Sequence, residues 1–227
     1  MFLGLARDQA VWYECHLTRK GGEWEVDVVT RIGTVGESSL EIVLGAALIK
    51  KGRFEWMIQK ACELGVSEIA PLTTRYVEGG LARQADKLLP RWRKILEESV
   101  KQCGRSRAPV MRPASRLVEF LESSPRVLQI VLDPAADNDL REIKRELGAI
   151  SSRRIAVLTG PEGGWGAEDR RLFEVHDIRP VFLGPRTLRA ETAALAAVSL
   201  VQYLWGDLAL PARGESPSLG DASLQRV

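Results

Sequence analysis

The stretch RIAVLTGPEGGWGAED, residues 154–169, decides the fold class. An apolar, strand-like run is followed by a glycine-rich turn and then by a helical pattern. A second junction of this kind, LGPRTLRAET at 183–192, also follows a short apolar run and leads into an alanine-rich helix. Glycines at the end of a strand let the backbone turn sharply and approach a ligand without an intervening Cβ.

Strand and helix patterns alternate along the chain from residue 53 onward. Gly65 is well placed to end the first of these helices, and Pro90 is expected to open the second. Such alternation predicts an α/β fold with a mainly parallel sheet. The expected strands are 66–72, 127–132, 154–159 and 180–183, and the expected helices are 53–65, the one from Pro90, 140–147, 168–175 and 191–205.

The N-terminal part has a different pattern. Residues 11–45 alternate between apolar and polar side chains, with Gly21-Gly22 as a turn, which predicts a short antiparallel meander. Two or three strands alone are marginal in water, so this segment reads as part of a small β domain. Residues 207–227 mix Pro, Gly, Ser and charge without a period, and we expect a disordered tail there. The expected domains are therefore 1–40, 41–206 and the tail.

Composition sets the class of protein. With 45% hydrophobic and 27% charged residues, the chain has ordinary globular composition. The three cysteines are odd in number and form no C-x-x-C pair, so we expect no disulfide framework and no metal site. The opening residues are too short for a signal peptide and no stretch reaches membrane-spanning length. We expect a cytoplasmic protein.

Charge is distributed unevenly although the formal net charge is only +2. Residues 83–116 hold ten cations and three anions, so phosphate is an expected neighbour of this segment. The alternative is an ordinary solvated helix face.

A single glycine-rich loop is weak evidence for a ligand, because its glycines can serve only to make turns. A phosphate-binding loop would end in Gly-Lys-Ser/Thr, and a dinucleotide site would show G-x-G-x-x-G at the start of a helix; neither is present. Sites for nucleoside triphosphates and dinucleotides are both disfavoured.

Taken together, the two junctions resemble the ribosomal RNA small subunit methyltransferase E family. The resemblance rests on GPEGG at 160–164 and on LG at 183–184 with LRxETA at 188–193. Two more stretches are similar, KG with IQKACELG at 51–65 and QCGR at 102–105. The likeness covers about residues 46–206.

The resemblance implies a methyltransferase of the SPOUT superfamily, with a deep trefoil knot and a homodimer. No periodicity predicts a knot, since unknotted chains are the rule. The family methylates N3 of one uridine in small-subunit ribosomal RNA, with S-adenosyl-L-methionine as cofactor. Members of the family also have a complete PUA-like N-terminal barrel that contributes to RNA binding, whereas here most of the first half of that barrel is missing. Either translation starts at Met1, or this sequence begins downstream of the true start.

The resemblance also assigns site residues. Arg189 is the predicted catalytic group, because loss of the N3 proton spreads charge onto two carbonyl oxygens and arginine stays protonated. The alternative for Arg189 is a structural salt bridge to Glu191, and we expect structural roles for Glu162 and Glu191. The general base is unassigned. Predicted RNA contacts are Gln102, Arg105 and Arg107, and predicted cofactor contacts are Leu158, Thr159, Gly160, Glu162, Gly163, Leu183, Gly184, Leu188 and Arg189.

Two other functions remain open from the sequence. One is a catalytically idle RNA-binding or ribosome-assembly protein that keeps the same knotted dimer. The other is a related knotted enzyme acting on ribose or on guanine in transfer RNA. The sequences of the two loops, GPEGG and LRxET, argue against this second alternative. Cofactor binding by the loops discriminates the first alternative from the enzyme.

Overall fold

The computed structural model describes residues 2–6, 11–34, 36–123, 127–148 and 153–209. Most of the predicted tail, residues 210–227, lies outside this described part. The strands are β1 Phe2–Ala6, β2 Val11–Lys20, β3 Glu23–Gly33, β4 Glu41–Ala47, β5 Glu68–Thr73, β6 Val110–Met111, β7 Ser115–Arg116, β8 Leu128–Leu132, β9 Arg154–Thr159 and β10 Arg179–Val181. The helices are α1 Lys51–Glu63, α2 Gly79–Cys103, α3 Leu117–Ser123, α4 Leu140–Leu147, α5 Ala167–Val175 and α6 Ala190–Trp205.

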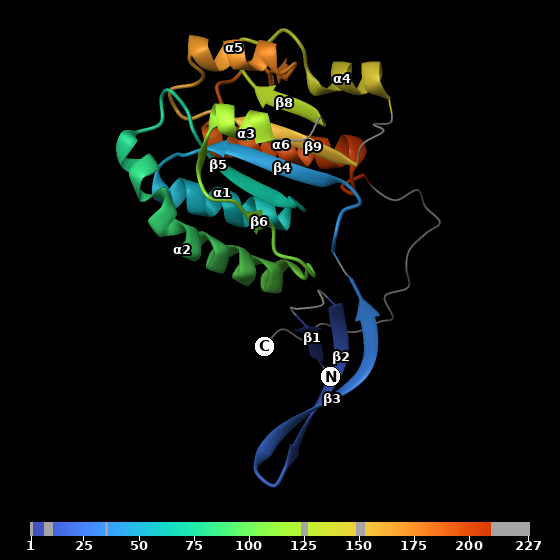
Figure 1. Cartoon of the computed structure of the whole chain (residues 1–227). Coiled ribbons are helices and arrows are strands. Elements are labelled where there is room, and N and C mark those ends of the chain that lie inside the picture. Colours follow the sequence, from blue (N-terminus) through green and yellow to red (C-terminus); the bar gives the residue numbers. More distant parts are fainter. Residues whose placement is uncertain (1, 7–10, 35, 124–126, 149–152, 210–227) are drawn as a thin grey trace.

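The strands form two sheets (Figure 1). Strands β1, β2 and β3 make an antiparallel sheet. The other seven make a second sheet in the order β10-β8-β9-β4-β5-β6, with β7 also paired to β5. Every pairing in this second sheet is parallel, which confirms the α/β fold with a mainly parallel sheet.

The core lies on both faces of the parallel sheet. One apolar cluster joins the sheet to α1, α2, α4 and α6, and a smaller one joins it to α3 and α5. A sheet covered on both faces buries its strands completely, which explains the continuous apolar runs in β4 and β9. The helices thus fix the strand ends from which the candidate loops emerge.

Strand β4 corrects one prediction. The pattern at 11–45 predicts residues 41–45 in the antiparallel meander, but the whole strand lies in the middle of the parallel sheet, paired with β9 and β5. Residues 42–49 are all buried. A strand buried on both faces needs no polar alternation, so its apolar run is the better signal.

Helix α2 corrects a second prediction. It begins at Gly79, and Pro90 lies inside it rather than at its start. An internal proline removes one helical hydrogen bond and disfavours the helix. Burial offsets this loss, because Ala85 before the proline and Trp92 after it are both buried, and the Trp92 ring lies 4.8 Å from that of Phe54.

Helix α1 ends as predicted. Gly65 has a φ of +83°, a conformation that favours glycine, and its N–H donates to the Cys62 carbonyl at 3.1 Å. A Cβ at this position would lie 2.6 Å from the Gln202 amide nitrogen. The turn therefore both stops α1 and lets α6 pack closely against it.

Candidate cofactor and RNA site

The two glycine-rich loops leave the parallel sheet at the same edge. Strand β9 ends at Thr159 and β10 ends at Val181, and the strands of the second sheet all run in one direction. The carboxyl ends of such strands are the usual binding edge of an open α/β sheet. The loops are separated in the sheet only by β8.

The first loop, 160–166, is fastened to the end of β8. The Trp165 indole N–H donates to the Leu132 carbonyl at 2.8 Å, and its ring packs edge-on against Phe173. Arg170 donates to the Trp165 carbonyl at 3.0 Å and to the Asp133 carboxylate at 2.8 Å. These bonds hold the loop in a defined shape before any ligand binds.

Asp133 stays charged in this arrangement. Burial pushes the pKa of its carboxyl upward, but the hydrogen bond from Arg170 and the one from the Ala135 N–H hold the pKa below its ordinary value. An anion at the end of β8 thus keeps Arg170 fixed beneath the loop.

The second loop, 182–189, is fixed at both ends. The Phe182 N–H donates to the Asn138 carbonyl at 3.0 Å. At the other end, the Thr159 hydroxyl donates to the Ala190 carbonyl at 3.5 Å. This last bond joins the end of β9, where the first loop starts, to the beginning of α6, where the second loop ends.

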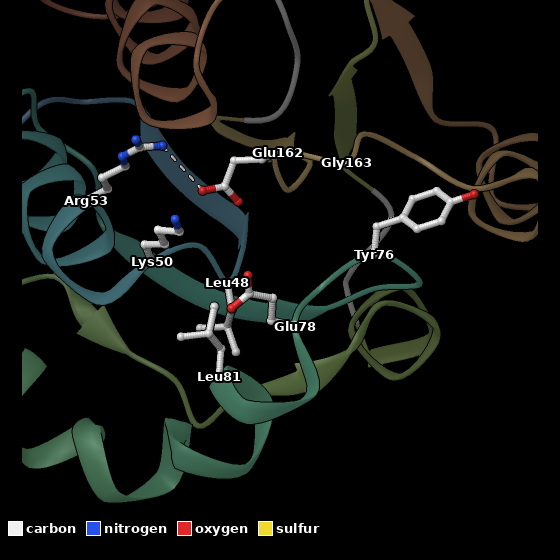
Figure 2. Close-up of a pocket in the computed structure, with 8 residues that line it drawn as sticks. All are labelled: Leu48, Lys50, Arg53, Tyr76, Glu78, Leu81, Glu162 and Gly163. Atoms are coloured by element: carbon white, nitrogen blue, oxygen red, sulfur yellow. Dashed lines mark ion pairs between the residues drawn. The ribbon is translucent and has the colours of Figure 1, made fainter.

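Arg53 makes a second connection between the loops. Its Nη1 lies 3.5 Å from Glu162 Oε1 in the first loop, and its Nε lies 3.7 Å from Glu191 Oε1 in the first turn of α6 (Figure 2 shows the pair with Glu162). Glu191 is buried, and its Oε2 has no hydrogen-bond partner within the described chain. Arg53 was not among the predicted site residues.

These contacts bear on the alternatives raised for the charged loop residues. Glu191 pairs with Arg53 and not with Arg189, so the expected structural role of Glu162 and Glu191 fits the geometry. Arg189 itself is exposed at the N-terminus of α6 and has no ion-pair partner among the described residues. Its guanidinium is free to face a ligand.

The glycines of the loops fall into two groups. A Cβ at Gly163 would lie 2.8 Å from Tyr76 Cβ, and one at Gly160 would lie 3.0 Å from the Trp165 ring. Contacts inside the protein therefore account for both. Gly164 and Gly184 have φ values of +72° and +85°, and a Cβ on either would meet no atom within 4 Å. Open space next to these two leaves room for a ligand.

Backbone donors are available along the second loop. The N–H groups of Leu183, Gly184 and Leu188 donate to no acceptor within the residues that the structure describes. Leu158 and Thr159 are buried in the sheet, whereas Glu162 and Gly163 are exposed. The predicted cofactor residues thus gather at one edge, and the exposed ones can offer main-chain atoms to a ligand.

A cavity of about 340 Å³ adjoins the first loop (Figure 2). It opens where the loop after β4, the loop after β5 and the first glycine loop meet. Its lining residues are Leu48, Lys50, Arg53, Tyr76, Glu78, Leu81, Glu162 and Gly163. No residue of the second loop lines it, so the cavity lies beside the space between the two loops and not within it.

The three predicted RNA contacts have different surroundings. Arg105 is only 4% exposed; it donates to the carbonyls of Cys62 and Val66 at 2.8 and 2.9 Å and pairs with Glu37 at 2.7 Å. These bonds fasten the segment that precedes β4 to the parallel-sheet part. Gln102 and Arg107 are exposed at and after the end of α2. The RNA contact predicted for Arg105 competes with its internal bonds.

Two features are absent from the residues that the structure describes. No cluster of three His, Cys, Asp or Glu side chains there has a geometry that could hold a metal ion. None of the helices in the described ranges is both long and apolar enough to cross a membrane.

Comparison with known proteins identifies the class. The sequence model of the RNA methyltransferase domain matches residues 36–202, which places the chain among RNA methyltransferases. The ribosomal RNA small subunit methyltransferase E of Bacillus subtilis is 31% identical over 173 residues, covering 74% of this chain and 67% of that protein. The one from Buchnera aphidicola (Schizaphis graminum) is 30% identical over 175 residues, covering 76% and 69%. The chain belongs to the ribosomal RNA small subunit methyltransferase E family.

Solved structures agree with this assignment. A protein of Legionella pneumophila, solved with bound S-adenosylmethionine, is 32% identical, has a TM-score of 0.79 and covers 91% of this chain and 84% of its own. The small subunit methyltransferase E of Neisseria gonorrhoeae, bound to S-adenosyl methionine, is 29% identical, with a TM-score of 0.77 and coverages of 88% and 81%.

Proposed function

We propose that the chain transfers the methyl group of S-adenosylmethionine to N3 of one uridine in small-subunit ribosomal RNA. The observation that carries this proposal is the joining of the two glycine loops, by the bond from Thr159 to Ala190 and by Arg53 between Glu162 and Glu191. The two similar proteins solved with the same cofactor support it.

The cofactor is proposed to lie between the loops and to supply a methyl group already bonded to a good leaving group. The free N–H groups of Leu183, Gly184 and Leu188 and the open space beside Gly184 fit a ligand with many polar atoms. The protein then contributes position and charge, which are the main requirements for in-line transfer. The proposed contacts are Leu158, Thr159, Gly160, Glu162, Gly163, Leu183, Gly184, Leu188 and Arg189.

Arg189 is proposed to stabilise the negative charge that the base acquires as N3 loses its proton. Its guanidinium is exposed, has no ion-pair partner in the described chain and stands at the N-terminus of α6, the positive end of the helix dipole. A fixed cation at the point where charge develops favours the transition state.

RNA is proposed to lie along α2 and the residues after it. Several exposed cations there have no ion-pair partner among the described residues, and such cations are typical of phosphate contacts. Gln102 extends the same surface, and Arg105 would act by fixing the segment around Glu37. These cations are Arg83, Lys87, Arg93, Lys94 and Arg107.

Further features follow from family membership. The antiparallel sheet is proposed to be part of a PUA-like RNA-binding domain within residues 1–40, followed by a SPOUT domain over 41–206. A trefoil knot is supported by the return of the chain from β10, at the edge of the sheet, to α6, which packs on α1 and β9. A homodimer is supported by the exposed apolar side chains of Leu200 and Tyr203 on α6. The proposed location is the cytoplasm.

The test is calorimetric titration with S-adenosylmethionine, followed by transfer of tritiated methyl groups to small ribosomal subunits that lack base methylation. Binding together with incorporation is expected. Binding without incorporation would favour a non-catalytic RNA-binding protein, and absence of binding would refute the cofactor site.

A further inference from the structure

We propose that the cavity beside the first loop holds the uracil base during methyl transfer. Lys50 would face a carbonyl oxygen of the base, and Glu78 would receive the N3 proton. This inference rests on the proposed function and adds the place of the base and the group that removes its proton, neither of which the sequence assigned.

The cavity lies next to the proposed cofactor site. It shares Glu162 and Gly163 with the first loop, but no residue of the second loop lines it. A ligand between the two loops and a ligand in the cavity would therefore be neighbours across the Glu162–Gly163 turn. Methyl transfer requires this arrangement, because donor and acceptor must be held within contact distance and in line.

The size of the cavity suits a nucleobase. Its volume is about 340 Å³, at the small end of the range of roughly 300–1,000 Å³ typical of small-molecule pockets. A nucleobase with part of its ribose suits such a space. Enzymes that modify a base inside structured nucleic acid turn that base out of its stack into a pocket, and the cations of α2 begin close by at Arg83, two residues after the lining residue Leu81.

The cavity contains charged side chains of both signs. Arg53 is already engaged by Glu162 and Glu191. Lys50 and Glu78, in contrast, have no side-chain partner among the described residues, and Figure 2 shows both in the same cavity as the Arg53–Glu162 pair, with the Tyr76 ring directed away. The cavity thus offers one free donor and one free acceptor, which match a uracil carbonyl oxygen and the N3–H.

Their places in the fold support a role other than helix capping. Lys50 is the N-cap residue of α1 and Glu78 is that of α2, and neither side chain makes a capping hydrogen bond. Ser, Thr, Asp, Asn and Gly are the residues usually preferred at this position. Two helices thus begin with charged side chains that make no capping hydrogen bond and that line one cavity.

Methyl transfer to the base then requires one proton transfer and one displacement at carbon. The N3–H bond breaks and its proton passes to Glu78, while the charge left on the base is shared between O2 and O4. Lys50 stabilises this charge from within the cavity, and Arg189 stabilises it from the second loop. The N3 lone pair forms a bond to the methyl carbon. The bond from that carbon to sulfur breaks, and sulfur keeps the electron pair as a neutral thioether.

Variants of the chain test the roles of Lys50 and Glu78. Lys50→Met should lower the single-turnover rate on small subunits at saturating S-adenosylmethionine by about 100-fold, the usual loss when one donor to a developing anion is removed. Its affinity for the cofactor should stay unchanged. Lys51→Met, one residue along and outside the cavity lining, should keep both the rate and the affinity.

Glu78→Gln tests the proton transfer through a pH profile. Without the carboxylate, hydroxide must remove the proton, so the rate should rise steadily with pH where the wild-type rate is flat. A merely structural role would lower the rate equally at every pH and would overturn the assignment. Asp86→Asn, on the exposed face of the same helix, should retain the wild-type profile.

A readout without turnover separates this inference from the proposed function. Fluorine NMR of 5-fluorouridine with protein that is loaded with S-adenosylhomocysteine should show line broadening for the wild type and for Lys51→Met, and sharp lines for Lys50→Met. If broadening follows this pattern but no methyl is transferred, the proposed function fails and the cavity assignment stands. Sharp lines with the wild type, or loss of cofactor binding in Lys50→Met, would overturn the cavity assignment.

Discussion

Replacement of Arg53 by methionine should destabilise the protein more than an exposed ion pair would suggest. Arg53 is 38% exposed, but its partner Glu191 is only 9% exposed and has a second carboxylate oxygen without a hydrogen bond. Surface pairs contribute about 0–1 kcal/mol, whereas removing one partner of a buried pair costs about 3–5 kcal/mol. The geometry lies between these cases, so we expect a loss of about 2 kcal/mol in the free energy of unfolding.

Urea denaturation followed by tryptophan fluorescence measures this loss, and a double-mutant cycle identifies its cause. Glu191→Gln removes the charge that Arg53 neutralises, so the double variant should be more stable than the sum of the single losses predicts by about 1 kcal/mol. Glu162→Gln is the matched control, because that exposed carboxylate should contribute less than about 0.5 kcal/mol. Strict additivity of Arg53→Met and Glu191→Gln would refute the reasoning.

Arg189, Gly65 and Cys103 each make contacts whose loss can be measured. Arg189→Ala should reduce methyl transfer at least about 10-fold while the affinity for S-adenosylmethionine falls only a few-fold, as measured by single-turnover rates and calorimetry; an unchanged rate would remove Arg189 from the site. Gly65→Ala should lower the free energy of unfolding, measured by urea denaturation, by about 2 kcal/mol. The φ of +83° at this position is strained for alanine, and the new Cβ would lie 2.6 Å from Gln202. Gly52→Ala is the control, because a Cβ there would meet nothing within 4 Å. The hydrogen bond with Cys62 lowers the pKa of the Cys103 thiol to about 6, so its alkylation by iodoacetamide should slow as pH falls through 6, and Cys62→Ala should move that midpoint upward.

Elements with local signals were predictable from the sequence. The expected boundaries of α4 and β9 agree with the structure at both ends. In α4 the start is fixed by Asp139 and Glu142, whose side chains bond to each other's backbone N–H groups in a capping box. Contacts between residues three apart in the chain are the kind that sequence patterns record.

Elements that depend on distant packing were less predictable. Pro90 looks like a helix start because proline is tolerated there, but burial of Ala85 and Leu81 against the core extends α2 eleven residues further toward the N-terminus. Strand β4 was assigned to the wrong sheet because its neighbours β9 and β5 are remote in sequence. Its unbroken apolar run was the signal that could have placed it.

The candidate site also has a part that the sequence predicts and a part that it does not. The glycine loops could be found from the sequence because their residues are contiguous, and Thr159 and Ala190 join them in space. Arg53 could not be found, since it meets Glu162 and Glu191 only after α1 has packed beside the sheet. The similar stretch at 51–65 was the one hint that this helix belongs near the site.

The most direct test of the central claim is mass spectrometry of the nucleosides from small-subunit ribosomal RNA after incubation with the protein and S-adenosylmethionine. The account predicts one N3-methyluridine per subunit, absent when the cofactor is omitted. A methyl group on ribose, on guanine or at another ring position would contradict the uridine assignment, and the absence of any methylated nucleoside would contradict the enzyme itself.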